Sequence, residues 1–295
     1  MSEILFWGVL KNVDESILGL KLDKGFVIKS CGYEEFLEII SRSQTSLGYY
    51  AHPYPDALFS QDDKIIYIEN KFKSVNQYQL APFQKEYIGN YLKPTLALLR
   101  LFKEGNIQSP LSYYFSIGKE QKTIKPFGSE KSNLYYSTGG CYKLKKEEIN
   151  ELEKFLNETK FPFLDHLQLA FENLDMSYTT QSNALAYLSI MTGVEAIFND
   201  GQGEIGYKIS RNMAMLLGNN KEDAQNIFKQ MKRLYNLRCK LVHQGHYKNV
   251  DIKDVIMLRE YLRSAIKKLV ILNKPKDALL EDLTFSGFEY LDVNK

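Results

Sequence analysis

Cysteine, histidine and long apolar runs are scarce in this chain, and each scarcity excludes a class of protein. The three cysteines, Cys31, Cys141 and Cys239, stand far apart, so the sequence predicts neither a disulfide framework nor a cysteine metal centre. The four histidines are too scattered to show the spacing of a zinc site. No run of about 18 apolar residues and no signal-peptide pattern occurs. We therefore expect a cytoplasmic protein without a membrane span, metal or cofactor.

An excess of charge of either sign is also missing. The net charge is +2, from 38 basic and 36 acidic side chains, so any affinity for nucleic acid must come from a local basic patch. The apolar share of 44% and the charged share of 25% are those of an ordinary globular protein. A length of 295 residues suffices for one large domain or two ordinary ones.

Residues 1–144 predict a mixed α+β module. Short apolar runs indicate strands at 4–10, 18–22, 26–29, 65–68, 113–117 and 134–136. Turn residues between the second and third runs predict a hairpin. Helical spacing of apolar residues predicts helices at 33–41 and 87–102. We expect this module to sense a trigger or to select a substrate.

From residue 145 the pattern becomes helical throughout. Helices are predicted at 145–158, 163–174, 180–198, 205–217, 222–243 and 251–272. The sequence therefore predicts an α+β fold in which residues 1–144 precede an all-α bundle of five or six helices, over residues 145–295.

Residues 234–245, Leu-Tyr-Asn-Leu-Arg-Cys-Lys-Leu-Val-His-Gln-Gly, contain a charge at a core position. Arg238 falls within one arc of apolar residues, made by Ile227, Met231, Leu234, Tyr235, Leu241 and Val242. An unpaired charge there would be costly. His243 lies about 140° from Arg238 on an ideal helix. Because Gly245 predicts the end of the helix, we expect relaxed geometry in the last turn to bring the two together.

A carboxylate stands at a matching position upstream. Glu195 lies near the centre of the apolar arc of the predicted helix 180–198, so we expect a buried ion pair between Glu195 and Arg238. Such a pair either fixes the register of two helices or orients Arg238 for function.

The segment 224–250 contains no Asp or Glu and predicts a positive field that favours an anionic ligand. Its basic residues are Lys229, Lys232, Arg233, Arg238, Lys240, His243, His246 and Lys248. We expect Lys232, Arg233, Lys240 and His246 to contact RNA.

The stretch 234–245 resembles the Arg-x4-His signature of the HEPN family (higher eukaryotes and prokaryotes nucleotide-binding), in particular its Apea-like branch. Residues 190–198 and 206–214 resemble two further helices of that branch, so the resemblance covers about residues 160–273. Cys239 departs from the small polar residue usual in the family, and Gln244 departs from the common His-Gly pair. The resemblance implies a metal-independent endoribonuclease of a toxin or antiviral-defence system, with an antitoxin or trigger protein as a further partner.

Arginine and histidine together suit cleavage of RNA by its own 2′-hydroxyl. Histidine transfers protons near neutral pH, and the arginine fork fits phosphate oxygens. We expect His243 to be the acid/base, Arg238 to bind phosphate and Glu195 to support Arg238. One histidine is too few for both proton transfers, so we expect a homodimer with a shared cleft, as the resemblance also implies.

Two readings without catalysis stay open. One is a HEPN-type module that binds a nucleotide or a partner protein, for which Cys239 at its altered position is the main support. The other is a scaffold whose basic segment is a solvated face. A nucleophilic Cys239 is a further alternative, although a small buried thiol is the commoner case.

Overall fold

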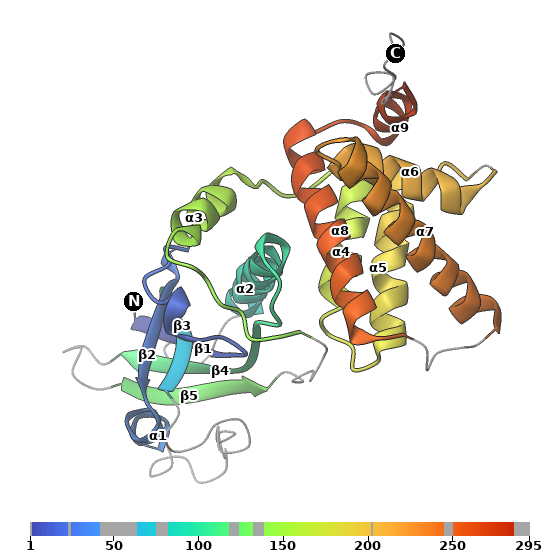
Figure 1. Ribbon diagram of the computed structural model, residues 1–295. Coiled ribbons are helices and arrows are strands. Elements are labelled where there is room, and N and C mark those ends of the chain that lie inside the picture. Colours follow the sequence, from blue (N-terminus) through green and yellow to red (C-terminus); the bar gives the residue numbers. More distant parts are fainter. Residues whose placement is uncertain are drawn as a thin grey trace. The chain divides into compact units, whose positions relative to one another are not determined.

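The computed structural model in Figure 1 describes residues 2–22, 25–41, 64–74, 82–117, 124–131, 139–201, 203–244 and 250–285. The chain divides into two compact units, the first made of Met1–Leu134 and Gly140–Glu158 and the second of Tyr135–Gly139 and Thr159–Lys295. Strands occur, among the described residues, in the first unit alone. The predicted combination of α and β structure is confirmed at this level.

The first unit contains a five-stranded antiparallel sheet with the strand order β2-β3-β1-β4-β5. The strands are β1 (Ser2–Lys11), β2 (Val27–Gly32), β3 (Lys64–Ser74), β4 (Gln108–Ile117) and β5 (Ile124–Lys131). The helical elements are η1 (Glu15–Ile17), α1 (Tyr33–Ser41), α2 (Pro82–Phe102) and α3 (Glu148–Glu158).

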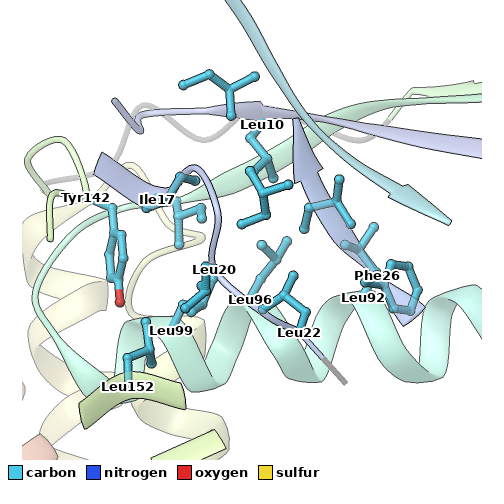
Figure 2. Packing of buried hydrophobic residues seen from close by; sticks show 14 of the residues in the cluster. Leu10, Ile17, Leu20, Leu22, Phe26, Leu92, Leu96, Leu99, Tyr142 and Leu152 are labelled. Carbon is cyan, nitrogen blue, oxygen red and sulfur yellow. The ribbon is translucent and has the colours of Figure 1, made fainter. Parts of the chain in front are cut away.

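Side chains of β1 point alternately into two separate cores, as the two-residue period of a strand requires. Phe6 and Leu10 belong to one cluster, whereas Trp7 and Val9 belong to the other. The first cluster includes buried residues of α2 and α3, among them Leu92, Leu96, Leu99 and Leu152, and Figure 2 shows these side chains directed into it. The second cluster includes Phe36 and Ile40 of α1.

The boundary between the units lies later than predicted, after Glu158 instead of residue 144. The reason is α3, which packs on the first unit. Its Leu152 is fully buried in the first cluster, and its Phe155 ring lies 5.7 Å from the Phe102 ring of α2. A salt bridge of 2.5 Å from Lys103 to Glu148 adds a polar contact.

The predicted hairpin around residues 23–25 was wrong. Residues 18–22 form no strand, because Asp14 caps η1 and the chain after it enters the first cluster through Leu20 and Leu22. Among the described residues of this stretch, an isolated bridge from Lys21 to Val27 is the only pairing of this kind, and β2 pairs with β3 instead. Strand β5 was not predicted, since its sequence Ile-Lys-Pro-Phe-Gly-Ser-Glu-Lys is polar and proline-containing, as suits the edge of a sheet. The predicted strand 134–136 lies outside the described residues.

The second unit contains the helices α4 (Asp165–Met176), α5 (Asn183–Phe198), α6 (Ile205–Leu217), α7 (Lys221–Gln244), α8 (Ile252–Leu272) and α9 (Lys276–Phe285). The first five match the predicted positions closely. Helix α9 was not predicted, because Pro275 was interpreted as the end of the last helix. In the structure Asn273 terminates α8 in a left-handed conformation, and Pro275 precedes the first turn of α9.

Helix α5 packs against α4 and α8 at very short range. A Cβ atom on Gly193 would lie 2.8 Å from Leu262 Cδ2 of α8 and 3.1 Å from the Ala170 carbonyl oxygen of α4. Glycine therefore allows the three helices to meet without displacing Leu262 or crowding the backbone of α4. This contact fixes α5, and with it the position of Glu195 two residues later.

Two arginines of α8 are buried inside the second unit. Arg259 is 0% exposed, and it donates from Nε to Ser177 Oγ at 2.9 Å and from Nη2 to the Ser177 carbonyl oxygen at 2.5 Å. Its guanidinium carbon lies 3.9 Å from the centroid of the Tyr178 ring. Arg263 donates from Nη2 to Tyr178 Oη at 2.6 Å. These bonds hold the connection between α4 and α5 against α8.

Candidate functional site

Helix α7 carries the predicted motif and is anchored on its apolar side. Ile227, Met231, Leu234 and Leu241 are buried there. The buried hydroxyl of Tyr187, on α5, donates to the Leu234 carbonyl oxygen at 2.6 Å. This bond ties the middle of α7 to α5, the helix that carries Glu195.

Glu195 and Arg238 form the predicted ion pair. Arg238 Nε lies 3.1 Å from Glu195 Oε1, and Arg238 Nη2 donates to Glu195 Oε2 at 3.5 Å. The burial of the pair was overestimated, because the side chains are 26% and 21% exposed. The cause is visible one turn later, where Val242, predicted as a core residue, is 48% exposed. The apolar arc of α7 therefore loses its cover close to Arg238, and the guanidinium keeps access to solvent.

Tyr235 completes the surroundings of Arg238. The guanidinium carbon lies 5.9 Å from the centroid of the Tyr235 ring. Burial raises the pKa of the Tyr235 hydroxyl, and the negative charge of Glu195 raises it further. The Tyr235 ring packs directly against Gly206 of α6, where a Cβ atom would lie 2.6 Å from Tyr235 Cδ1. The half-buried Cys239 thiol is the next neighbour along the helix.

His243 is exposed in the last turn of α7. The helix continues through Gln244, so the expected relaxation before His243 does not occur. Regular helical geometry keeps His243 about 140° around the axis from Arg238. The expectation that one chain brings the two side chains together was therefore wrong. Gly245, His246 and Lys248 lie outside the described residues.

His243 instead continues a different, exposed stripe of α7. Helical geometry places it about 20° from Asn236 and about 60° from Lys240. These two residues line a groove of about 690 Å³ between α7 and the start of α8. We call it the α7–α8 groove, and its lining residues are Phe228, Lys229, Lys232, Arg233, Asn236, Leu237, Lys240 and Asp254.

The α7–α8 groove unites three of the residues that were expected to contact RNA, Lys232, Arg233 and Lys240. It also contains Asp254, a carboxylate that the acid-free segment 224–250 did not lead us to expect. Arg233 Nη2 lies 2.8 Å from Asp254 Oδ1, and this hydrogen bond raises the pKa of Arg233. The spacing of Lys229, Arg233, Asn236, Lys240 and His243 by three or four residues is the sequence signal that could have revealed the stripe.

The arrangement offers several cations and the imidazole of His243 to an anionic ligand. Within the described ranges, no three or more His, Cys, Asp or Glu side chains lie together in a way that could hold a metal ion. The described helices also include none that is long and apolar enough to cross a membrane.

Comparisons with protein-family models, with curated proteins and with solved structures found no match.

Proposed function

We propose that this chain is a metal-independent endoribonuclease of the HEPN type and that its second unit is the HEPN bundle. One observation carries the proposal: the arginine of the Arg-x4-His motif is held by a carboxylate at 3.1 Å and is still 26% exposed. A fully buried pair could only fix the register of two helices, because no ligand could reach its guanidinium. A guanidinium that is 26% exposed can bind a phosphate without first leaving the protein interior.

The reaction follows from the chemistry of RNA. The 2′-oxygen attacks the adjacent phosphorus, the bond from phosphorus to the 5′-oxygen breaks, and a 2′,3′-cyclic phosphate and a 5′-hydroxyl result. One base must accept the 2′-hydroxyl proton, and one acid must protonate the leaving 5′-oxygen. His243 serves as acid or base, and Arg238 stabilises the negative charge that develops on the phosphoryl oxygens. Glu195 is a positioning residue that acts through Arg238.

One chain cannot present the Arg238 guanidinium and the His243 imidazole to the same phosphate, because His243 lies about 140° around the axis of α7 from Arg238. A homodimer solves this problem, since a two-fold axis sets the same patch of two chains face to face. Arg238 of one copy can then meet His243 of the other across one cleft. Two histidines also supply the two proton transfers that the reaction needs.

The biological setting that we propose is a toxin or an antiviral-defence system. The first unit would sense a trigger or select the RNA, and an antitoxin or trigger protein would control the nuclease. This part of the proposal is supported by the resemblance of the motif stretches alone.

Incubation of the full chain with RNA tests the chemistry. We expect cleavage in the presence of chelator, 2′,3′-cyclic phosphate ends, and no cleavage where the cut site carries 2′-deoxyribose. His243→Ala should abolish cleavage, whereas His52→Ala, a histidine distant in sequence from the motif, serves as the matched control. Cleavage of DNA, or equal activity of the His243→Ala protein, would refute the mechanism.

A mixing experiment tests the shared site. Wild-type protein is titrated with excess His243→Ala protein, and the subunits are allowed to exchange. Activity should disappear as heterodimers form, because each heterodimer keeps only one of the two histidines that the two proton transfers need. Heterodimers that keep half of the wild-type activity would mean two independent sites and would contradict a composite site.

The alternative is a non-catalytic HEPN module that binds a nucleotide or a partner protein. The observation in its favour is the same ion pair, because Glu195 engages Arg238 and the regular helix keeps His243 apart from Arg238. A protein that binds a nucleotide or a partner protein and leaves RNA intact would establish this alternative.

A further inference from the structure

The α7–α8 groove lies on the side of α7 opposite to the ion pair. Lys229, Asn236 and Lys240 point about 160–180° away from Arg238 around the helix axis. The groove is therefore a separate surface from the arginine side of the motif. Its volume, about 690 Å³, falls in the range of sites that hold a molecule of one or two nucleotides' size.

The charge of the groove is not neutralised by the protein. Lys229, Lys232 and Lys240 are exposed, and no carboxylate pairs with them among the residues that the structure describes. Arg233 differs, because Asp254 holds it at 2.8 Å. Three lysines and one tethered arginine along a single helix face form a track that suits a chain of phosphates.

The groove also contains an aromatic ring. Phe228 lines it, and the ring of Tyr207 from α6 meets Phe228 edge to face with centroids 5.7 Å apart. Lys232 Nζ lies 5.9 Å from the centroid of the Phe228 ring. A supported ring beside cations is the combination by which proteins bind unpaired bases and the phosphates attached to them.

We propose that the α7–α8 groove binds a single-stranded segment of the RNA substrate next to the cut. The lysines contact its phosphates, Phe228 stacks against one base, and the Asn236 amide offers both a donor and an acceptor to a base edge. The identity of the ligand as substrate rests on the proposed function. A duplex is excluded as the preferred ligand, since its bases are already stacked on one another.

The position of His243 connects the groove to the chemistry. It lies on the same stripe as the groove, one turn beyond Lys240. The stripe from Lys229 to His243 spans about 21 Å along the helix. A strand that follows the lysines therefore passes His243, and the groove determines which phosphate reaches it. Single-strand binding and the choice of cut site are thus properties of the same helix face.

A binding assay with RNA that resists cleavage tests the groove. The ligand is a fluorescein-labelled single-stranded RNA with 2′-O-methyl groups throughout, and the full chain is titrated into it at several salt concentrations while anisotropy is followed. The test protein carries Lys229→Gln, Lys232→Gln and Lys240→Gln. The control protein carries Lys146→Gln, Lys160→Gln and Lys221→Gln, three exposed lysines outside the groove.

We expect the groove variant to bind at least roughly tenfold more weakly at low salt. The slope of log K against log salt should fall by about 2, because each phosphate contact on a single strand contributes about 0.7. The control should behave as the unmodified chain. Phe228→Leu, which keeps an apolar side chain against Tyr207, should weaken binding about tenfold with an unchanged salt slope. A groove variant that matches the control, or a duplex that binds as tightly as the single strand, would overturn the proposal.

The outcome is distinguishable from that of the nuclease proposal. Binding that depends on the groove lysines, in a chain that leaves ordinary RNA intact, supports the groove and refutes the endoribonuclease. Cleavage by the groove variant with an unchanged KM supports the endoribonuclease and refutes the groove. Melting curves of all variants establish that the exposed substitutions leave the fold intact.

Discussion

The Glu195–Arg238 pair should contribute a moderate and measurable coupling energy to the second unit. The perturbation is a double-mutant cycle of Glu195→Gln, Arg238→Gln and the double variant. A fully buried pair that loses one partner costs about 3–5 kcal/mol, and an exposed pair contributes about 0–1 kcal/mol. With side chains 26% and 21% exposed, a stranded Arg238 can turn to water. We therefore expect a coupling of about 1–2 kcal/mol.

The assay has to separate the two units. Trp7 is the only tryptophan of the chain and lies buried in the first unit, so its fluorescence identifies the unfolding of that unit. Loss of helical circular dichroism without a change in tryptophan fluorescence then reports the second unit. For a unit of this size, a change of 1–2 kcal/mol shifts the midpoint by about 3–8 °C. The Trp7 transition should not move.

Two results would refute this reasoning. A coupling below about 0.3 kcal/mol would mean that the side chains are not paired in solution. A coupling above about 3 kcal/mol would mean full burial, and then Arg238 would have no solvent access for a phosphate. Loss of nuclease activity in Glu195→Gln with a normal melting curve would show that the pair positions Arg238 and does not merely stabilise the fold.

Three further predictions concern the second unit. Arg259→Met should destabilise it by about 3 kcal/mol in the same melting assay, since buried bonds to Ser177 are lost, whereas the exposed Arg233→Met should cost less than about 1 kcal/mol. Burial, and then Lys276, lowers the pKa of His166, so the unfolded chain takes up that proton first, and stability should fall as the pH drops below about 6.5. His166→Gln should flatten that dependence. Gly206→Ala should displace the Tyr235 ring, with a chemical-shift change in the aromatic spectrum.

The course of the helices could be predicted because amphipathic periods dominate their sequence. The predicted range 205–217 coincides with α6, and α5, α7 and α8 differ from their predictions by a few residues. The strands were harder to predict from the sequence, because apolar runs and strands did not always coincide. The edge strand β5 carries little apolar sequence, and residues 18–22 are apolar because they fill a core without pairing in a sheet.

The candidate site was predictable in its parts but not in its geometry. Periodicity placed Glu195 and Arg238 on facing arcs, and they do pair. Periodicity did not reveal where the neighbouring helices stop covering α7, so the exposure of Val242 and of the pair was missed. The segment 224–250, which has no Asp or Glu, also gave no sign that a carboxylate would pair with Arg233. That carboxylate belongs to Asp254, which approaches Arg233 from another helix. Tertiary contacts of this kind are not encoded in the local pattern.

The buried arginines of α8 show what a charge at a core position signifies. Arg259 interrupts the apolar arc of its helix just as Arg238 does, and the same argument from desolvation applies to both. The structure separates them by their partners. Arg259 is 0% exposed and donates to a serine hydroxyl and a backbone carbonyl, which satisfies it and leaves no room for a ligand. Arg238 is held by a side-chain carboxylate, and both members of the pair stay partly exposed at the rim of the core. A misplaced arginine is thus a functional candidate only when its partner can be exchanged for a phosphate, and Arg238 meets that condition whereas Arg259 does not.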